Sequence, residues 1–367
     1  MKNDNNELSA EQKALARKAL RDPVLFANGF LGARQWERQA EILQLIATQT
    51  RTAIRSSHAV GKSFVLAIAV LWWLARHRDG IALTVAPTER QIETVLWPEI
   101  RRVVARAKVP YPKIMTRKMT LRGDNNFALG LSTDQAPNFQ GYHGKEVLVV
   151  VDETPGVASD IFDAIDGIAA GGTVHIVMAG NPTNASGPFY QAFTKERALW
   201  NCISIDAFDS PNVRCICNER HDDFTIETLR SLPPGLTEND SPVFAHKPWR
   251  ELVSRFWVCQ MYWKHGEASA FWVSRVRGQF PAQADDALYS LVRLEEARLG
   301  PSRPIVDDGI SPVTIGIDIA GPGEDETVAV VRCGKNLLSY QVWNEADPTK
   351  LQGAVLAYVN QYKDASG

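Results

Sequence analysis

The sequence predicts an α/β fold with a central, mostly parallel sheet that helices cover on both faces. From about residue 50 to about residue 206, short runs rich in Val and Ile alternate with segments of helical periodicity. The strand runs are nearly continuously apolar, as expected of parallel strands buried on both faces. The expected strands are 52–56, 81–87, 146–153, 173–181 and 202–208, and the expected helices between them include 64–77 and 88–107.

The chain is expected to contain four segments. Residues 1–210 would form the sheet domain with its N-terminal helices, and residues 211–298 would form a subdomain attached to it. Residues 299–312 are rich in Pro, Gly and Asp, which is typical of an interdomain linker. A new strand pattern follows in residues 313–367, so this segment would begin a second domain.

Composition indicates an ordinary globular protein of the cytoplasm. The 367 residues are 45% hydrophobic and 22% charged, with a net charge of −2, so any contact with nucleic acid must come from local patches. The N-terminus lacks a secretory pattern, and the longest apolar run, Phe64 to Ala75, is too short to cross a bilayer. Five cysteines in a long chain favour a reducing compartment. Cys215, Cys217 and His221 could suggest zinc, but loop thiols fit better because no second ligand pair lies nearby.

Residues 54–70, IRSSHAVGKSFVLAIAV, follow the phosphate-loop pattern G-x-x-x-x-G-K-[ST], except that Ser56 replaces the first glycine. Gly61 would let the backbone approach phosphate, Lys62 would neutralise the β- and γ-phosphates, and Ser63 would offer its hydroxyl to Mg²⁺. The alternative is an ordinary strand–turn–helix in which Gly-Lys-Ser occurs by chance. The other loop residues expected around the phosphates are Ser57, His58, Ala59 and Val60.

The strand EVLVVVDE, residues 146–153, ends in two acids, which matches the second motif of such nucleotide sites. Asp152 would hold Mg²⁺ through water, and Glu153 would orient and deprotonate the attacking water. A solvated strand end is the alternative. Because this strand follows the loop, with the extra strand 81–87 between them, the pattern favours a P-loop ATPase of the ASCE class, which carries a catalytic glutamate.

Three further residues could contact the nucleotide. Gln39 lies upstream of the loop, where its amide could recognise adenine while Trp36 packs near the base. Gln39 could equally be a residue on the surface of a helix. Asn181 ends the strand 173–181 and could sense the γ-phosphate, or it could simply form a turn.

Together these residues resemble the large terminase subunit of tailed bacteriophages, which packages and cuts DNA. The resemblance rests on W-x-x-Q, the glycine-poor phosphate loop, the strand ending in Asp-Glu, the Gly-Asn-Pro strand end and VRGQFPAQ at residues 276–283. Most specific is GIDIAGPGEDETVAVV, residues 316–331, which is similar to the opening of the family's ribonuclease H-like nuclease.

The resemblance implies a second metal site and several partners. Asp318 would be the first metal-binding carboxylate of the nuclease and Asp325 its second acid, both acting with two Mg²⁺ or Mn²⁺ ions. Asp318 could instead cap a glycine-rich turn. The implied partners are double-stranded DNA, a portal protein, a small terminase subunit and other copies of the chain in a ring on the procapsid. The implied location is the cytoplasm of the bacterial host.

Two departures from the family concern the cation that phosphoryl transfer needs. Some terminases carry an Arg in the loop where this chain has His58, and others carry one just before the second motif, where this chain has Gln140. The expected source is therefore an Arg of a neighbouring subunit, and the sequence does not choose among the candidates. These are Arg101, Arg102, Arg117 and Arg122.

The sequence ends soon after the first helix expected in the nuclease, so we expect the ATPase to be complete and the nuclease not. A truncated chain, a broken reading frame and one of two pieces all fit, and in each case residues 313–320 would form an unpaired sheet edge. Two other functions remain open: a helicase-like or repair ATPase, and an assembly module that binds nucleotide only to set oligomer shape.

Overall fold

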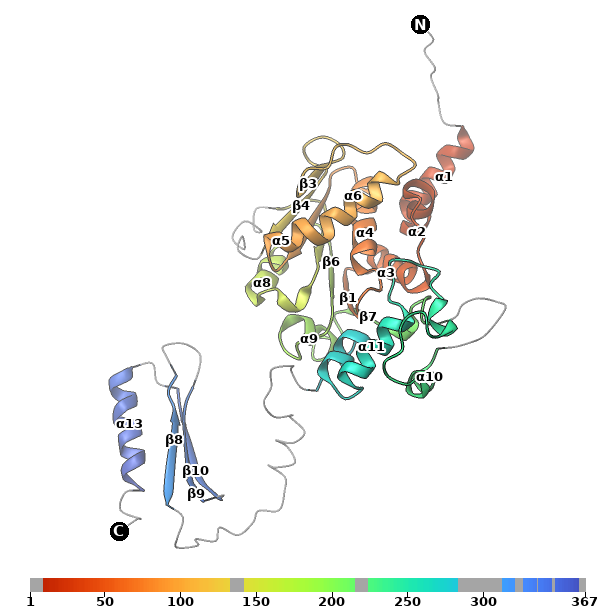
Figure 1. Ribbon diagram of the computed structural model, residues 1–367. Helices are drawn as coiled ribbons and strands as arrows, with labels where there is room; N and C mark the ends of the chain where they lie inside the picture. The colour runs from red at the N-terminus through yellow and green to blue at the C-terminus, as the bar shows by residue number, and fades with distance from the viewer. Residues whose placement is uncertain are drawn as a thin grey trace. The chain divides into compact units, whose positions relative to one another are not determined.

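A computed structural model describes residues 9–132, 142–214, 224–282, 312–320, 326–334, 336–344 and 347–362. The chain divides into two compact units, Met1–Arg293 and Leu294–Gly367, each of which is described by itself (Figure 1). In the described ranges, no helix is both long enough and apolar enough to cross a membrane.

The first unit is built on a seven-stranded sheet in the order β3-β4-β2-β5-β6-β1-β7. Neighbouring strands run parallel, apart from the antiparallel pair β3 and β4. The α/β class with a mostly parallel sheet is therefore confirmed. The strands are β1 (Arg51–Ser56), β2 (Gly80–Ala86), β3 (Lys118–Thr120), β4 (Phe127–Ser132), β5 (Glu146–Val151), β6 (Thr173–Gly180) and β7 (Asn201–Ile205).

Two features of the sheet differ from the expectation. β3 and β4 were not expected, because β3 has only three residues and β4 carries Gly130 within its run. The second difference is the strand that lies between the loop strand β1 and the acidic strand β5, which was expected to be 81–87. β2 lies between β1 and β5 in the sequence, but β6 lies between them in the sheet.

Alternate residues of the central strands bury against opposite helical layers. In β5, Leu148 and Val150 join the apolar cluster that includes α3, α4 and α6, whereas Val147 and Val149 join the cluster that includes α8 and α9. Such alternation requires apolar residues at consecutive positions, which explains the continuous valine run. The helices of this unit up to β7 are α1 (Ala10–Arg21), α2 (Pro23–Phe26), η1 (Ala27–Leu31), α3 (Glu37–Thr48), α4 (Lys62–Arg76), α5 (Glu89–Gln91), η2 (Ile92–Leu96), α6 (Trp97–Ala105), η4 (Thr154–Gly156), α8 (Ser159–Ile168) and α9 (Gly187–Phe193).

Helix α4 is the central helix of this unit and begins directly after the phosphate loop. Every residue from Val65 to Ala75 is buried, as in a helix that is apolar on all sides. Its two tryptophans still satisfy their indole N–H groups: Trp72 donates to the carbonyl of Leu20 at 3.1 Å, and Trp73 to that of Glu146 at 3.4 Å. The packing of α4 therefore holds the loop that precedes it.

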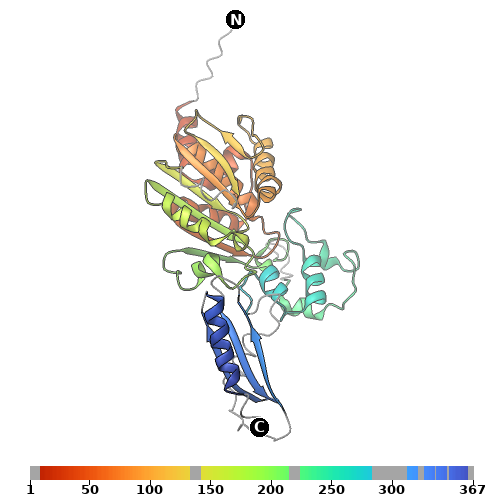
Figure 2. The same cartoon turned by 90° about the vertical axis from the view of Figure 1, so that its left-hand side faces the viewer.

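The rest of the first unit is a helical subdomain that follows β7. Its elements are η5 (Ala207–Asp209), α10 (Ile226–Ser231), η6 (Pro242–Ala245), α11 (Arg255–His265) and η7 (Trp272–Val276). Figure 2 shows its helices, in green and teal, gathered beside the sheet layers. Aromatic side chains of this subdomain, including Phe244 and Trp272, join the same apolar cluster as α4.

The second unit is an antiparallel sheet in the order β10-β9-β8 with one helix. Its elements are β8 (Val313–Asp318), β9 (Thr327–Cys333), β10 (Asn336–Trp343) and α13 (Pro348–Asn360). β8 pairs only with β9 in the described residues, so it forms an edge of this sheet. Ile315 is half-buried and Ile317 is exposed.

Candidate functional site

The phosphate loop, Ser57 to Gly61, connects β1 to α4 in a conformation that depends on two left-handed residues. Ala59 has φ 51° and Gly61 has φ 83°. A Cβ atom at Gly61 would lie 2.3 Å from the side-chain nitrogen of Gln39, so any other residue would displace the Gln39 amide as well as strain the backbone. Ser56, in place of the usual first glycine, is fully buried, and its hydroxyl accepts a hydrogen bond from Lys62 at 3.1 Å.

The carbonyl groups of the loop are held by residues distant in the sequence. Asn181 donates to the carbonyl of Ser56 at 2.7 Å, and Gln39 donates to that of Val60 at 3.2 Å. The backbone N–H of Val253 donates to the carbonyl of Ala59 at 2.8 Å. In contrast, the N–H groups from Ala59 to Ser63 make no hydrogen bond within the described part of the chain. A row of free N–H groups at a helix N-terminus is suited to an anion.

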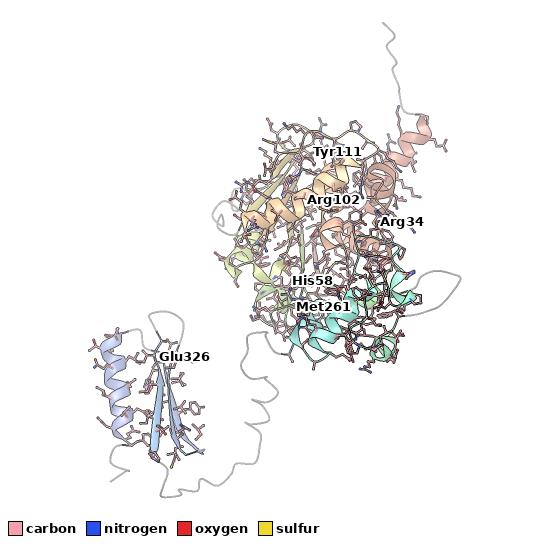
Figure 3. All side chains as sticks on the ribbon, viewed as in Figure 1. Arg34, His58, Arg102, Tyr111, Met261 and Glu326 are labelled. Atoms are coloured by element: carbon pink, nitrogen blue, oxygen red, sulfur yellow. The ribbon has the colours of Figure 1, made fainter. Side chains whose placement is uncertain are left out.

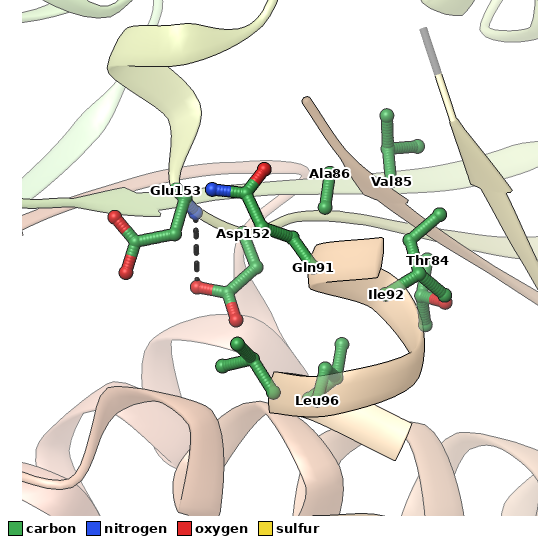
Figure 4. A pocket seen from close by; sticks show the side chains of 9 residues that line it. Thr84, Val85, Ala86, Gln91, Ile92, Leu96, Asp152 and Glu153 are labelled. Atoms are coloured by element: carbon green, nitrogen blue, oxygen red, sulfur yellow. Dashed lines mark hydrogen bonds between the residues drawn. The ribbon is translucent and has the colours of Figure 1, made fainter. Parts of the chain in front are cut away.

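Ser63 and Asp152 meet at the ends of α4 and β5. The Ser63 hydroxyl donates to the Asp152 carboxylate at 3.3 Å. The N–H of Glu153 donates to the other oxygen of Asp152 at 3.0 Å, the bond drawn as a dashed line in Figure 4. Asp152 is only 2% exposed. Glu153 has φ 50°, a left-handed conformation that a non-glycine residue adopts at a cost. Strain at this position is typical of functional sites.

Burial shifts the pKa values of two groups at this site in opposite directions. Desolvation raises the pKa of Asp152 from 3.8 to about 6, and the nearby Glu153 adds to the shift. Desolvation lowers the pKa of Lys62, although Glu153 and Asp152 act against this. Both groups would therefore gain from a ligand that brings the opposite charge.

Gln39 lines the cavity beside the loop, whereas Trp36 does not. Gln39 is 2% exposed, so it is not a surface residue, and its amide also donates to the loop. Trp36 is buried in the apolar core and does not line the cavity beside the loop. The tryptophan that lines this cavity is Trp249, over which Arg34 lies with its guanidinium carbon 5.1 Å from the ring centroid.

The cavity beside the loop has a volume of about 480 Å³. Figure 3 shows Arg34, His58 and Arg102, which reach it from three separate segments. Lys62, Ser63, Glu153 and Asn181 also line it, so the structure brings most of the expected nucleotide residues to one place. Asn181 lines this cavity, and its amide also holds the carbonyl of Ser56. Neither a γ-phosphate sensor nor a turn former, the two roles expected for Asn181, includes this support of the loop.

An arginine that the sequence analysis did not consider lies against the loop. Arg275 of η7 donates from Nη1 to Nε2 of His58 at 3.0 Å, and its carbonyl accepts the N–H of His58 at 2.9 Å. Burial, together with the charges of Lys62 and Arg275, lowers the pKa of His58 to about 4. No local pattern could have revealed this contact, because 217 residues separate the two partners.

The expected nuclease residues are only partly described. Asp318 is exposed at the end of the edge strand β8, whereas Asp325 lies outside the described residues, as do Gln140, Cys215, Cys217 and His221. Among the described residues, no three His, Cys, Asp or Glu side chains are grouped to hold a metal ion.

The strand order and the loop define a P-loop fold in which an added strand, β6, separates the loop strand from the acidic strand. No protein-family model matches the sequence. The chain is 23% identical over 351 residues to the probable large terminase subunit of Enterobacteria phage P7, covering 90% of this chain and 64% of that protein. It thus spans less than two thirds of that relative's length.

Solved structures of phage large terminases are similar to this chain, among them the following two. The large terminase of bacteriophage HK97 matches with a TM-score of 0.50 and 15% identity, over 88% of this chain and 67% of that one. The large terminase of a thermophilic bacteriophage matches with a TM-score of 0.44 and 10% identity, over 90% of this chain and 75% of that one. The P7 and HK97 matches confirm the resemblance to a phage large terminase subunit that the motifs indicate.

The raised pKa of Asp152 predicts that this carboxylate lowers the stability of the folded, nucleotide-free protein at neutral and higher pH. A carboxyl whose pKa is raised on folding contributes stability below its unfolded pKa and loses it as pH rises through about 6. We therefore expect Asp152→Asn to raise the unfolding free energy of the nucleotide-free protein by ~1–3 kcal/mol at pH 8, and by much less at pH 4.5, which lies only just above the unfolded pKa of 3.8. Denaturant unfolding at both pH values measures this. Asp163→Asn, at an exposed position, is the control, and a gain of equal size at both pH values would contradict the account.

Gly278 provides a test of how closely the subdomain packs on the loop. It has φ +60°, and a Cβ there would lie 2.5 Å from the carbonyl oxygen of Ile205 and 2.8 Å from the nitrogen of Ser57. Because these are backbone atoms, Gly278→Ala must displace the loop or the segment after η7. We expect a lower melting temperature and at least ~10-fold weaker binding of a fluorescent ATP analogue. Gly235→Ala, with φ +91° but no neighbour within 4 Å, has the backbone strain alone and should bind normally.

Proposed function

We propose that this chain hydrolyses ATP and that it is the ATPase of a phage DNA-packaging motor. The observation that carries the proposal is the convergence of Lys62, Ser63, Asp152 and Glu153 beside one cavity, with the Ser63 hydroxyl 3.3 Å from the Asp152 carboxylate. The fold similarity to the HK97 terminase supports the choice among ATPase classes.

The residues at this site fit ATP and Mg²⁺. The free N–H groups of the loop suit phosphate oxygens, and Lys62 is close enough to move its ammonium from Ser56 to a phosphate. Ser63 and Asp152 supply the oxygen ligands that Mg²⁺ prefers, and Asp152 is a buried carboxylate that lacks a full countercharge. When bound, Mg²⁺ would neutralise the charge that develops on the phosphates.

The chain's own residues then have separate tasks. Glu153 would orient and deprotonate the attacking water, because it borders both the 480 Å³ cavity and an open cleft of about 570 Å³ next to it. Asn181 would keep the loop at a constant distance from β6 while its side chain faces the same space. Arg34 and Trp249 present a guanidinium and an indole on which an adenine ring could stack.

The wider role follows from the terminase relatives. We extend to this chain the partners expected of that family: double-stranded DNA, a portal protein, a small terminase subunit and further copies of itself in a ring, in the cytoplasm of the host. We also propose that the second unit is part of a metal-dependent nuclease in which Asp318 is one of the metal-binding acids. A helicase-like ATPase or an assembly module is the alternative.

The first experiment separates binding from hydrolysis. Lys62→Ala should abolish binding of a fluorescent ATP analogue, because the loop loses its only cation. Glu153→Gln should bind normally but hydrolyse at least ~100-fold more slowly, since it lacks the general base. Lys195→Ala, at an exposed position, is the control. If Lys62→Ala binds as tightly as wild type, the phosphate-loop assignment fails.

The second experiment separates a DNA motor from an assembly module. Phosphate release should increase several-fold when linear double-stranded DNA is added, because a translocating motor hydrolyses ATP as it moves along DNA. The effect should decrease at high salt, since the contacts are to backbone phosphates. Glu153→Gln gives the background rate. Hydrolysis that is equally fast with and without DNA would favour the module.

A further inference from the structure

Arg275 is held against the phosphate loop by both its backbone and its side chain. Its carbonyl accepts the N–H of His58 at 2.9 Å, and its Nη1 donates to Nε2 of the same residue at 3.0 Å. Two residues after η7 comes Gly278, which lies so close to Ser57 that no side chain fits between them. Backbone contacts therefore fix the main chain at Arg275 relative to the loop, and the bond to His58 Nε2 places its guanidinium.

His58 accepts this hydrogen bond because it is neutral. Its pKa of about 4 leaves Nε2 with a free lone pair at physiological pH, provided that Nδ1 carries the proton. The imidazole also packs edge-on against Trp257 of α11, with ring centroids 6.1 Å apart. One N–H of the guanidinium is used in this way, and an arginine has four more.

Among the described residues, no carboxylate pairs with Arg275. The ion pairs in this part of the chain involve other arginines, and the Nε of Arg275 is buried without a hydrogen-bond partner. Its neighbour Arg277, in contrast, is paired with Asp206 at 2.6 Å. Arg275 lines the open cleft together with Glu153 and Asn181. The guanidinium carbon lies 5.4 Å from the ring centroid of Phe271. A cation that has an aromatic neighbour but no carboxylate partner in the described part of the chain, beside the proposed catalytic glutamate and the phosphate loop, is available to a ligand of opposite charge.

We propose that Arg275 supplies, within one chain, the cation that stabilises the transferred phosphoryl group, and that His58 is its positioning residue. This rests on the proposed ATPase function and replaces the expectation that a neighbouring subunit must provide the arginine. The loop has no arginine of its own, but the subdomain brings one to the same place. A preorganised guanidinium at the γ-phosphate stabilises the charge of the transition state more than that of the ground state.

Three of the arginines considered from the sequence have other contacts in the chain, and the fourth lines a different site. Arg101 donates to the carbonyl of Thr116 at 3.1 Å, Arg102 pairs with Glu99 and Arg117 pairs with Glu89. Arg122 lines a separate pocket with Arg78. Arg102 lines the neighbouring 480 Å³ cavity, but none of the four borders the cleft that Arg275 shares with Glu153.

The kinetic test uses Arg275→Ala in the full chain. We expect kcat to fall ~10²–10³-fold, the usual loss for one preorganised donor, and KM for ATP to rise by no more than ~10-fold. Arg275→Lys should recover part of this loss. Because the backbone bond from His58 to residue 275 does not depend on the side chain, the fold should be unaffected. Arg230→Ala, which removes an exposed pair with Glu267 in the same subdomain, is the matched control and should hydrolyse normally.

The positioning role of His58 has its own readouts. His58→Ala should lower kcat ~10-fold, and His58→Gln, which keeps an acceptor, should restore most of it. In His58→Arg combined with Arg275→Ala, the loop itself carries the guanidinium to the same point, so activity should return. Restoration by His58→Gln and by this double variant is not expected if His58 only fills space.

Two measurements do not depend on turnover. Arg275→Ala should bind ADP as wild type does but bind ATPγS ~10-fold more weakly, because only the latter has a third phosphoryl group. In the nucleotide-free protein, NMR titration should show a higher pKa for His58 in Arg275→Ala, since one of the two neighbouring cations is gone and Lys62 remains.

The outcomes separate the two proposals. If wild type neither binds nor hydrolyses ATP, the proposed function itself fails. If wild type hydrolyses ATP and Arg275→Ala retains its rate within ~3-fold, the ATPase assignment stands and the role of Arg275 is refuted. A rate per chain that rises with protein concentration and is unaffected by Arg275→Ala would show that the cation comes from another subunit.

Discussion

The structure depends on one constraint: the phosphate loop must present its N–H groups inward while its carbonyl groups are held outward. The carbonyls of Ser56, Ala59 and Val60 each accept a hydrogen bond from a residue outside the loop. This requires left-handed conformations at Ala59 and Gly61, which an isolated peptide would adopt rarely. The surrounding contacts therefore stabilise a conformation that the local sequence does not favour.

The residues that hold the loop come from every part of the first unit. Gln39 belongs to α3, Asn181 follows β6, and Val253 and Arg275 belong to the helical subdomain. The hydrogen bonds at His58 and Ala59, two adjacent loop residues, exist only when the subdomain is docked on the sheet. A nucleotide bound as proposed would therefore be coupled to the position of the subdomain.

Local pattern was sufficient for the part of the site that adjoins regular elements. Lys62 and Ser63 begin a helix, and Asp152 and Glu153 end a strand, so spacing and apolar periodicity predict their places. Packing decides the rest. The sequence could not show that β6 separates the two motif strands, that Trp249 rather than Trp36 reaches the cavity, or that Arg275 contacts His58. Each of these facts depends on tertiary contacts between distant segments, and the residues next to each position in the sequence do not predict such contacts.

The serine that breaks the usual loop pattern has a physical role in this arrangement. Its hydroxyl and the carbonyl of Ser57 hold the Lys62 ammonium at 3.1 and 3.3 Å in the nucleotide-free protein. A glycine could offer only the backbone, which would leave a desolvated ammonium with fewer partners. Burial lowers the pKa of Lys62, and the charges of Glu153 and Asp152 act against this. Because the Ser56 hydroxyl accepts a hydrogen bond from the same ammonium, the serine that replaces glycine also favours its charged form.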